Sequence, residues 1–308
     1  MGKPTFIIGG ERRSGSTTLY ESLKTHPEID MLPQSDYDFF IEPELFAKTP
    51  PENTELNRWE ATNDIFNYEK LFDNLQDVCG QKDADLLWWK PSHKRLASHL
   101  PDTKFIFILR DPVKRAESQY FNELRKGRET LTFKEALLRE EKGTLNSWEK
   151  LHLQYKARGC YVKSLEHFFK YINRDRVRVI ILEELFLDWE MTMGQLADFL
   201  GVDGTHFLKL KPVHSNKKVN LVRRDFSNKP AVKWFFDLWD RATEACIVRT
   251  NKTTDSRMKW RKRLRGAYYK SRPADLETNR QIYEELQRYY RPYNKRLEEL
   301  LGIKLKHW

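Results

Sequence analysis

Three apolar runs divide the chain into a repeating pattern of predicted strands and helices. The runs cover Phe6–Ile8, Lys104–Leu109 and Val177–Leu182. Apolar runs of this kind, in which Arg178 is the single internal polar residue, are typical of strands that are buried on both faces of a parallel sheet. Segments with helical spacing follow the runs, beginning near Ser16, near Val113 and at Asp188. This alternation predicts an α/β fold, a three-layer sandwich in which helices flank a central parallel sheet and ligands bind at the carboxyl edge of the strands.

Further helices are predicted from the apolar spacing of other segments. They cover Asn63–Val78, Phe133–Glu141, Gln154–Tyr171 and Asp275–Leu301. Pro292 is expected to kink or divide the last of them, because proline removes a helix hydrogen bond. From residue 205 to residue 273 the chain becomes rich in basic residues. We expect a single domain over residues 1–308, in which residues 205–273 form a basic cap or insert over the functional site.

The charge of the chain narrows the choice of ligands. Its 308 residues include 55 Lys and Arg against 45 Asp and Glu, which gives a formal charge of +10. Such an excess suits nucleic acid, an anionic membrane or a small anionic ligand. No nucleic-acid-binding signature accompanies the charge, and no apolar run is long enough to span a membrane. We therefore expect a small polyanionic ligand and neither a nucleic-acid nor a membrane partner.

The cysteines and the N-terminus bear on the compartment. Cys79, Cys160 and Cys246 are odd in number and far apart, which argues against a disulfide framework and fits a reducing compartment. Their spacing builds no metal site. The first predicted strand begins almost at once and leaves no room for a signal peptide. We expect a cytoplasmic protein that requires no metal.

The segment FIIGGERRSGSTTLY, residues 6–20, predicts an anion-binding loop between the first strand and its helix. The N–H groups of such a loop and of the helix N-terminus converge on one place, where a phosphate or sulfate can bind. Most of the Walker A pattern is present in Gly10, Gly15, Ser16 and Thr17. The lysine of that pattern is missing, and positive charge lies inside the loop at Arg12 and Arg13.

Four stretches then occur in an informative order along the chain. They are ERRSGSTTLYESLKTHPEI, FIFILRDPVKRAESQYFNELRKGRE, RGCYVKSLEHFFKYINRDRVRVIILEELFLDWEMTMGQLADFLGV and RQIYEELQRYYRPYNKRLEELLGI. Together they resemble the sulfotransferases that use 3′-phosphoadenosine 5′-phosphosulfate (PAPS), in the branch that includes carbohydrate sulfotransferases and many bacterial members. The resemblance implies a P-loop-like fold. It also implies in-line transfer of the sulfuryl group from PAPS to a hydroxyl or amine, with release of adenosine 3′,5′-bisphosphate.

The resemblance places the donor in the first loop and at the end of the second predicted strand. The loop residues implied in donor binding are Arg12, Arg13, Ser14, Gly15, Ser16, Thr17 and Thr18. Arg110 and Ser118 match the pair that binds the 3′-phosphate, and Tyr161 of the RGCYVKSL stretch joins the donor site. Arg13 stands where many relatives carry a lysine on the scissile bridge. Arginine can offset charge on the leaving phosphate, but it cannot supply a proton.

A base and a second cation are implied for the transfer itself. Related enzymes carry a Lys-Glu pair followed by two residues and Phe-Phe, and this chain has Ser35-Asp36-Tyr37-Asp38-Phe39-Phe40. Asp36 takes the place of the glutamate and is the first choice for the base, and Asp38 is the second. Lys90 matches a lysine near the transferring group. His93 is an alternative base, although we expect it to be a surface histidine.

The acceptor is expected to bind between aromatic and acidic side chains. The candidates are Trp88, Trp89, Trp148, Asp36, Asp38, Glu42 and Glu44. Aromatic faces and carboxylates would hold a cationic or hydroxylated small molecule, such as a natural product. A carbohydrate O-sulfotransferase is the nearest alternative.

Three other readings of the sequence stay open. A P-loop kinase would need a lysine in the loop, which has Ser16 there instead. A basic nucleic-acid-binding protein would use the segment Lys209–Lys270. A degenerate sulfotransferase would bind the nucleotide without turnover, because Arg13 and Asp36 replace the usual lysine and glutamate. The segments His214–Lys218 and Arg263–Lys270 are candidate nucleotide contacts.

Overall fold

The computed structural model describes residues 2–32, 65–126, 128–210, 221–223, 269–271 and 276–308. The chain forms two compact units. The first comprises residues 1–120, 131–217 and 283–308, and the second comprises residues 121–130 and 218–282. In the second unit, β6 (Leu221–Arg223) pairs antiparallel with β7 (Tyr269–Ser271). Most of the predicted basic segment, residues 205–273, lies outside the described residues.

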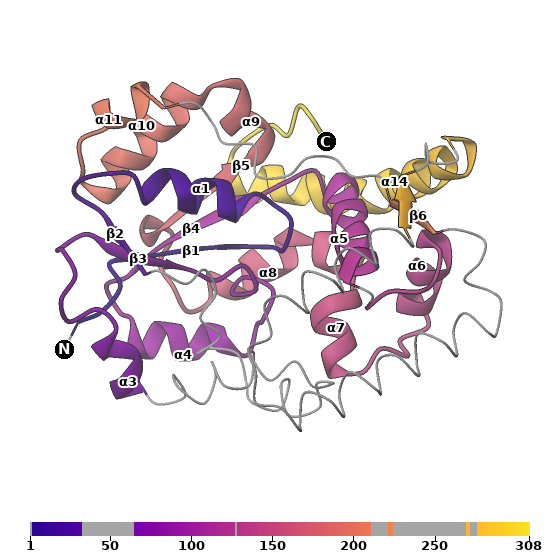
Figure 1. Ribbon diagram of the computed structural model, residues 1–308, viewed down its shortest axis with the longest axis horizontal. Helices are drawn as coiled ribbons and strands as arrows, with labels where there is room; N and C mark the ends of the chain where they lie inside the picture. Colours follow the sequence, from indigo (N-terminus) through magenta and orange to yellow (C-terminus); the bar gives the residue numbers. More distant parts are fainter. Residues whose placement is uncertain (1, 33–64, 127, 211–220, 224–268, 272–275) are drawn as a thin grey trace. The chain divides into compact units, whose positions relative to one another are not determined.

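The first unit is built on a parallel sheet of five strands in the order β2-β3-β1-β4-β5 (Figure 1). Its strands are β1 (Phe6–Gly10), β2 (Asp30–Met31), β3 (Cys79–Lys82), β4 (Lys104–Leu109) and β5 (Val177–Ile181). Each of the three predicted apolar runs forms one of these strands, which confirms that part of the prediction. β2 and β3 were not predicted, because β2 has only two residues and β3 has the sequence CGQK.

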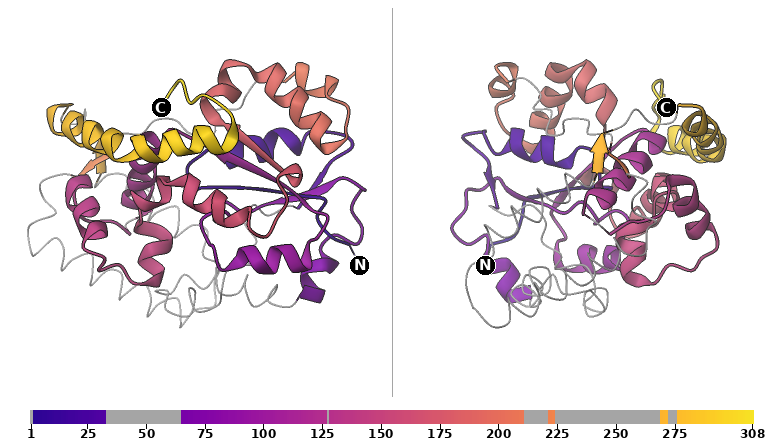
Figure 2. Two further views of the ribbon diagram at one scale, coloured as in Figure 1. Left: turned by 180° about the vertical axis from the view of Figure 1, so that it is seen from behind. Right: turned by 45° about the vertical axis from the view of Figure 1, so that its right-hand side comes forward.

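Alternating side chains of the central strands enter two separate cores, one on each face of the sheet. Phe6 and Ile8 of β1 face a core shared with α1 (Ser16–Leu23) and α10 (Trp189–Leu200). Ile7 faces the other core, which contains residues of α4 (Ser92–His99) and α8 (Tyr161–Phe168). Figures 1 and 2 show these helices on opposite sides of the sheet. The three-layer α/β sandwich is therefore confirmed.

The remaining helices connect or follow these layers. They are α3 (Ile65–Lys70), α5 (Pro112–Lys126), α6 (Phe133–Glu141), α7 (Ser147–Leu153), α9 (Leu182–Leu187), α11 (Thr205–Leu208) and α14 (Leu276–Leu301), with short 3₁₀ turns at Ala157–Gly159 and Arg174–Arg176. The bounds predicted for α6 are confirmed. Its first turn is fixed by a capping box in which Thr132 and Glu135 bond each other's backbone N–H groups.

Two helix predictions differ from the structure, and of the two effects expected of Pro292 one is excluded. The helix predicted for Asn63–Val78 is described only over α3, and the chain then turns into β3. The helix predicted for Gln154–Tyr171 is reduced to α8 and the 3₁₀ turn before it. Pro292 does not divide α14, which continues to Leu301. Among the helices of the described residues, none combines the length and the apolar character that crossing a membrane would need.

Candidate active site

The loop between β1 and α1 takes a conformation that needs its glycines. Gly10 and Gly15 have φ angles of 131° and 103°, in the region that side chains rarely adopt. A Cβ on Gly10 would lie 2.4 Å from the carbonyl oxygen of Ile108, and one on Gly15 would lie 2.5 Å from Leu182 Cδ1. Arg13 has a φ of 70° without being glycine. The backbone of this loop is thus fixed closely against the ends of the neighbouring strands.

The N-terminus of α1 opens onto this loop and suits an anion. Gly15 is its N-cap and provides no side-chain hydrogen bond, and the first turn contains no acidic residue. The N–H groups of a first helical turn have no partner within their own helix, and the helix dipole adds partial positive charge there. Ser16, Thr17 and Thr18 supply this turn, as the sequence predicted for its start.

Four of the residues implied in donor binding lie in one hydrogen-bonded cluster, which we call the donor cluster. Arg13 Nε donates to Ser118 Oγ at 3.2 Å, and Arg110 Nη1 donates to the carbonyl oxygen of Arg13 at 3.2 Å. Tyr161 OH donates to the carbonyl oxygen of Arg110 at 2.7 Å. The cluster joins the first loop, the end of β4, helix α5 and the start of α8. Residues that are more than a hundred positions apart in sequence therefore meet at the carboxyl edge of the sheet.

The side chain of Arg12 is directed to protein groups. Its Nε donates to both carboxylate oxygens of Asp85, at 2.8 and 2.6 Å, and its Nη1 donates to His152 Nδ1 at 2.7 Å. These bonds tie the loop to the segment after β3 and to α7, and the predicted contact of Arg12 with the donor stays a prediction. Asp85 and His152 were not predicted as site residues, since nothing local in their sequence links them to the loop.

A buried arginine completes the support of the loop. Arg158 Nε donates to Glu11 Oε2 at 2.8 Å, and its Nη2 forms an ion pair with Asp85. Its Nη1 donates to the carbonyl oxygen of Leu151 at 2.8 Å, and its guanidinium lies 4.5 Å from the ring centre of Trp88. The side chain of Arg158 has no exposed surface. Glu11, Asp85 and Arg158 thus form a buried charge network beneath the loop, and Arg12 extends it.

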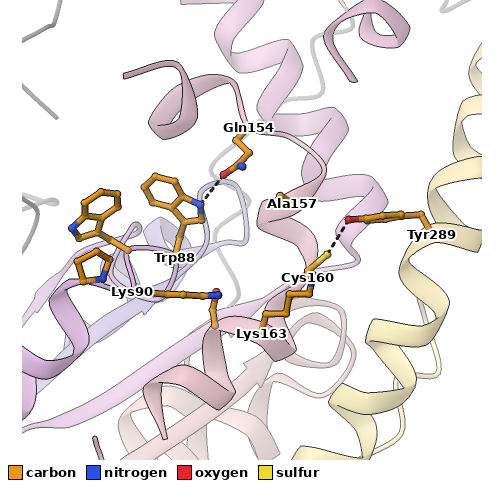
Figure 3. A pocket seen from close by; sticks show the side chains of 10 residues that line it. Trp88, Lys90, Gln154, Ala157, Cys160, Lys163 and Tyr289 are labelled. Carbon is orange, nitrogen blue, oxygen red and sulfur yellow. Dashed lines mark hydrogen bonds between the residues drawn. The ribbon is translucent and has the colours of Figure 1, made fainter. Parts of the chain in front are cut away.

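A cavity of about 320 Å³ lies beside this network, in the first unit (Figure 3). It is lined by Trp88, Trp89, Lys90, Pro91, Gln154, Ala157, Cys160, Lys163, Ser164 and Tyr289. Trp88 forms part of its wall and donates from Nε1 to Gln154 Oε1 at 3.0 Å. The ring centres of Trp88 and Trp89 are 5.3 Å apart. The structure therefore brings Trp88, Trp89 and Lys90 together, whereas Trp148 packs on His152, with ring centres 4.7 Å apart, and does not line this cavity.

Comparison with known proteins decides the family. A family model described as "Sulfotransferase family" matches residues 4–206, about two thirds of the chain. The chain belongs to the sulfotransferase family. The match includes the first loop, the donor cluster and every described residue of the cavity except Tyr289.

Two curated relatives of this sulfotransferase are named as heparan sulfate glucosamine 3-O-sulfotransferases. Human heparan sulfate glucosamine 3-O-sulfotransferase 3B1 is 23% identical over 306 residues, which cover 97% of this chain and 63% of the relative. Human heparan sulfate glucosamine 3-O-sulfotransferase 6 is 25% identical over 202 residues, which cover 65% of this chain and 52% of the relative. The chain thus spans between half and two thirds of the length of these relatives.

A solved structure supports the fold of this sulfotransferase. The sulfotransferase from Alicyclobacillus acidocaldarius superposes with a TM-score of 0.68 at 24% identity, over 100% of this chain and 99% of that chain. At this identity the likeness shows the fold, and it agrees with the parallel sheet derived from the apolar runs.

Two carboxylates in the buried network of the sulfotransferase have opposite pKa shifts. Burial raises the pKa of Glu11 to about 7, although Arg158 and Arg115 oppose the shift. Burial also disfavours the charge on Asp85, but Arg12 and Arg158 outweigh it and lower its pKa to about 2. Asp85 is therefore ionised in the folded protein over the whole range in which Glu11 titrates.

We predict that Glu11 makes the sulfotransferase less stable as the pH rises from its ordinary pKa of 4.5 to about 7. In this window the folded protein holds a proton that the unfolded chain has already released, so the free energy of unfolding falls with pH. Glu11→Gln cannot titrate. The stability of the wild type relative to Glu11→Gln is expected to decrease by about 3 kcal/mol across the window. Denaturant titrations of both proteins at several pH values measure this difference, and a difference that stays constant with pH would contradict the assignment.

His93 is not a surface histidine, so that prediction is wrong. It is fully buried, and its Nε2 lies 3.2 Å from the carbonyl oxygens of both Leu86 and Leu87. Carbonyl oxygens only accept, so Nε2 carries the proton, and Nδ1 accepts from His167 Nδ1 at 3.0 Å. Burial, followed by the proximity of His167, lowers the pKa of His93 to about 4. Both ring nitrogens are thus engaged in bonds that fix the segment after β3.

The carboxylates predicted to act as base or to attract the acceptor lie outside the described residues. They are Asp36, Asp38, Glu42 and Glu44. Within the part of the chain that the structure describes, no group of three or more His, Cys, Asp or Glu residues is arranged to hold a metal ion.

Proposed function

We propose that the chain transfers the sulfuryl group of PAPS to a hydroxyl or amine by in-line displacement and releases adenosine 3′,5′-bisphosphate. The observation that carries this proposal is the donor cluster, in which Arg13, Arg110 and Ser118 meet beside the N-terminus of α1. PAPS carries anionic groups at both its 5′ and 3′ positions. The cluster offers a helix N-terminus and two arginines, which are groups suited to such anions.

Each group has a proposed role in the reaction. The N–H groups of Ser16, Thr17 and Thr18 bind the 5′-phosphosulfate, while Arg110 and Ser118 bind the 3′-phosphate. As the bond between sulfur and the bridging oxygen breaks, the negative charge on the leaving phosphate grows, and Arg13 offsets it. Positioning and electrostatics of this kind carry most of the catalysis in the analogous phosphoryl transfers. The roles require no metal, since arginines and backbone N–H groups supply the positive charge.

The acceptor proton needs a base, and we propose Asp36 for it, with Asp38 as the second candidate. A carboxylate is a competent general base when it lies within hydrogen-bonding reach of the acceptor. Lys90, on the wall of the cavity, is proposed to lie near the transferring group. The new bond then forms between the acceptor oxygen or nitrogen and sulfur, while Asp36 receives the proton.

We propose a small molecule as the acceptor, bound in the cavity beside Lys90. The volume of this cavity, about 320 Å³, is at the lower end of the range found for small-molecule binding sites. A carbohydrate O-sulfotransferase is the second candidate, and it is favoured by the curated relatives, whose names specify glucosamine of heparan sulfate. Both candidates share the donor site and the reaction.

Binding of adenosine 3′,5′-bisphosphate tests the donor site directly. We expect this nucleotide to raise the melting temperature of the protein without magnesium. Arg110→Ala is expected to weaken its binding about tenfold to a hundredfold, because a hydrogen bond to a charged group contributes about 1.5–3 kcal/mol. Thermal-shift titrations of the wild type and the variant measure both effects, and transfer from labelled PAPS to an acceptor panel measures turnover.

The alternatives predict different results. A P-loop kinase would respond only to ATP with magnesium, and a nucleic-acid-binding protein would bind oligonucleotides whether or not the bisphosphate is present. A degenerate sulfotransferase would bind the bisphosphate normally and transfer nothing. Equal affinity of the wild type and Arg110→Ala for the bisphosphate would reject the assignment of Arg110.

A further inference from the structure

The described walls of the cavity carry positive charge that no described carboxylate neutralises. Lys90 and Lys163 both line it. Neither lysine takes part in the ion pairs found among the described residues. Lys163 instead lies over the ring of Tyr293, with its Nζ 4.6 Å from the ring centre. Figure 3 shows the side chains of Lys90 and Lys163 on the same side of the cavity.

The acidic residues described near the cavity are engaged elsewhere. Glu166, on the same helix as Lys163, pairs with Arg296 at 2.7 Å. Glu140 accepts from three backbone N–H groups, and Glu141 pairs with Lys156. Asp85 is held by Arg12 and Arg158. The described lining of the cavity therefore contains two cationic side chains, Lys90 and Lys163, and no carboxylate.

Aromatic rings form the other part of the wall. Trp88 and Trp89 lie on the segment after β3, and Tyr289 approaches from α14. The hydroxyl oxygen of Tyr289 accepts from the thiol of Cys160 at 3.6 Å, which fixes the tyrosine on the opposite wall. Flat apolar walls of this kind hold the face of a ring.

We propose that the cavity binds an acceptor that carries a carboxylate or another anionic group next to a ring. This inference rests on the proposed function and names the acceptor class of the same site. The ring packs on Trp88, Trp89 and Tyr289, and the anion lies between Lys90 and Lys163. The acceptor proposed here is anionic, whereas the acidic residues in the sequence had suggested a cationic acceptor.

The test compares acceptors that differ only in charge. One set shares a phenol: 4-hydroxyphenylacetate, its neutral amide, and tyramine, which is cationic. A second set shares a sugar ring: glucuronate, glucose and glucosamine. Calorimetric titration into protein saturated with adenosine 3′,5′-bisphosphate measures binding of each. In at least one set the anionic member is expected to bind about three- to tenfold more tightly than the neutral one, since Lys163 is exposed and its charge is partly screened.

Variants of two neighbouring lysines decide whether the cavity is responsible. Lys163→Glu is expected to abolish or reverse the preference for the anion. Lys156→Met is the matched control, because Lys156 lies 3.9 Å from the ring centre of Tyr289 but is paired with Glu141 and does not line the cavity. It should leave the preference unchanged.

Three results would overturn the proposal: no binding in either set, binding of the neutral or cationic member at least as tight as that of the anion in both sets, or a preference that survives Lys163→Glu. Binding of the bisphosphate separates this failure from a failure of the proposed function. If the protein binds the bisphosphate but shows no preference for the anion, only the proposed acceptor class is rejected. If the protein does not bind the bisphosphate, the proposed function itself is rejected.

Discussion

Arg158→Met is expected to lower the free energy of unfolding by about 3–5 kcal/mol, because it removes the cation that two buried carboxyl groups share. Arg158 is the group that joins Glu11 in the loop to Asp85 after β3. Both carboxylates are almost fully buried. In the variant Asp85 keeps only Arg12 as its cation, and Glu11, whose pKa is about 7 even beside Arg158, has to take up a proton at pH 7 to stay buried. Chemical denaturation at pH 7 measures the loss, and a variant that does not fold at all agrees with the upper end of the range.

Arg176→Met provides the matched control. Arg176 also donates to backbone groups, through Nη2 to the carbonyl oxygens of Leu100 and Thr103, but it pairs with no carboxylate in the described part of the chain. Its loss removes hydrogen bonds without stranding a buried charge, and it is expected to cost about 1–3 kcal/mol. Equal losses for the two variants would mean that the buried network contributes no more than ordinary hydrogen bonds. Adding Glu11→Gln to Arg158→Met should restore part of the stability, because the carboxyl group that lost its only ion-pair partner in the network is then a neutral amide.

The parts of the fold that depend on apolar burial could be predicted from the sequence. β1 and β4 lie in the middle of the sheet and are almost entirely buried, and the edge strand β5 is buried at its carboxyl end; their sequences are apolar except for Lys104 and Arg178. β3 is equally buried but has the sequence CGQK, so its apolar signal is absent. Gly80 is required there, because a Cβ would lie 2.5 Å from the ring of Phe6. A strand whose residues allow a neighbouring side chain to pack close to its backbone, and which has few apolar side chains, shows no apolar pattern from which it could be predicted.

In the candidate active site, too, the features that could be predicted depend on neighbouring residues in the sequence, and those that could not depend on residues far apart in it. The glycines and the hydroxyls of the first loop predicted an anion site, because their backbone requirements are local. The sequence could not distinguish the contacts of Arg12 and Arg13, which are adjacent and were both predicted to bind the donor. Asp85 makes the distinction, since it binds Arg12 from a position 73 residues later. Arg158 could not be recognised as part of the support either, because its partners are 147 and 73 residues away.

Arg13→Gly is expected to lower kcat by about 10²–10³, the effect of removing one preorganised group that stabilises charge in a transition state. The substitution also separates catalysis from stability. Arg13 has a φ of 70°, a conformation that costs a residue with a side chain about 1–2 kcal/mol and costs glycine almost nothing. Relief of this strain offsets the greater flexibility of glycine in the unfolded chain and the lost hydrogen bond to Ser118. The free energy of unfolding is therefore expected to change by no more than about 1 kcal/mol.

Arg13→Lys is the conservative comparison for this prediction. A lysine keeps the positive charge and is the residue that the family resemblance implies at this position, so most of the turnover should remain. Single-turnover rates with saturating PAPS, together with the affinity for adenosine 3′,5′-bisphosphate, measure the three proteins. Full turnover by Arg13→Gly would show that Arg13 has no part in the reaction. A stable Arg13→Gly protein that binds the bisphosphate but transfers slowly, beside an active Arg13→Lys protein, would identify the charge at this position as catalytic. It would also exclude the alternative of a degenerate sulfotransferase that binds the nucleotide without turnover, because a slower variant requires that the wild type itself catalyses transfer.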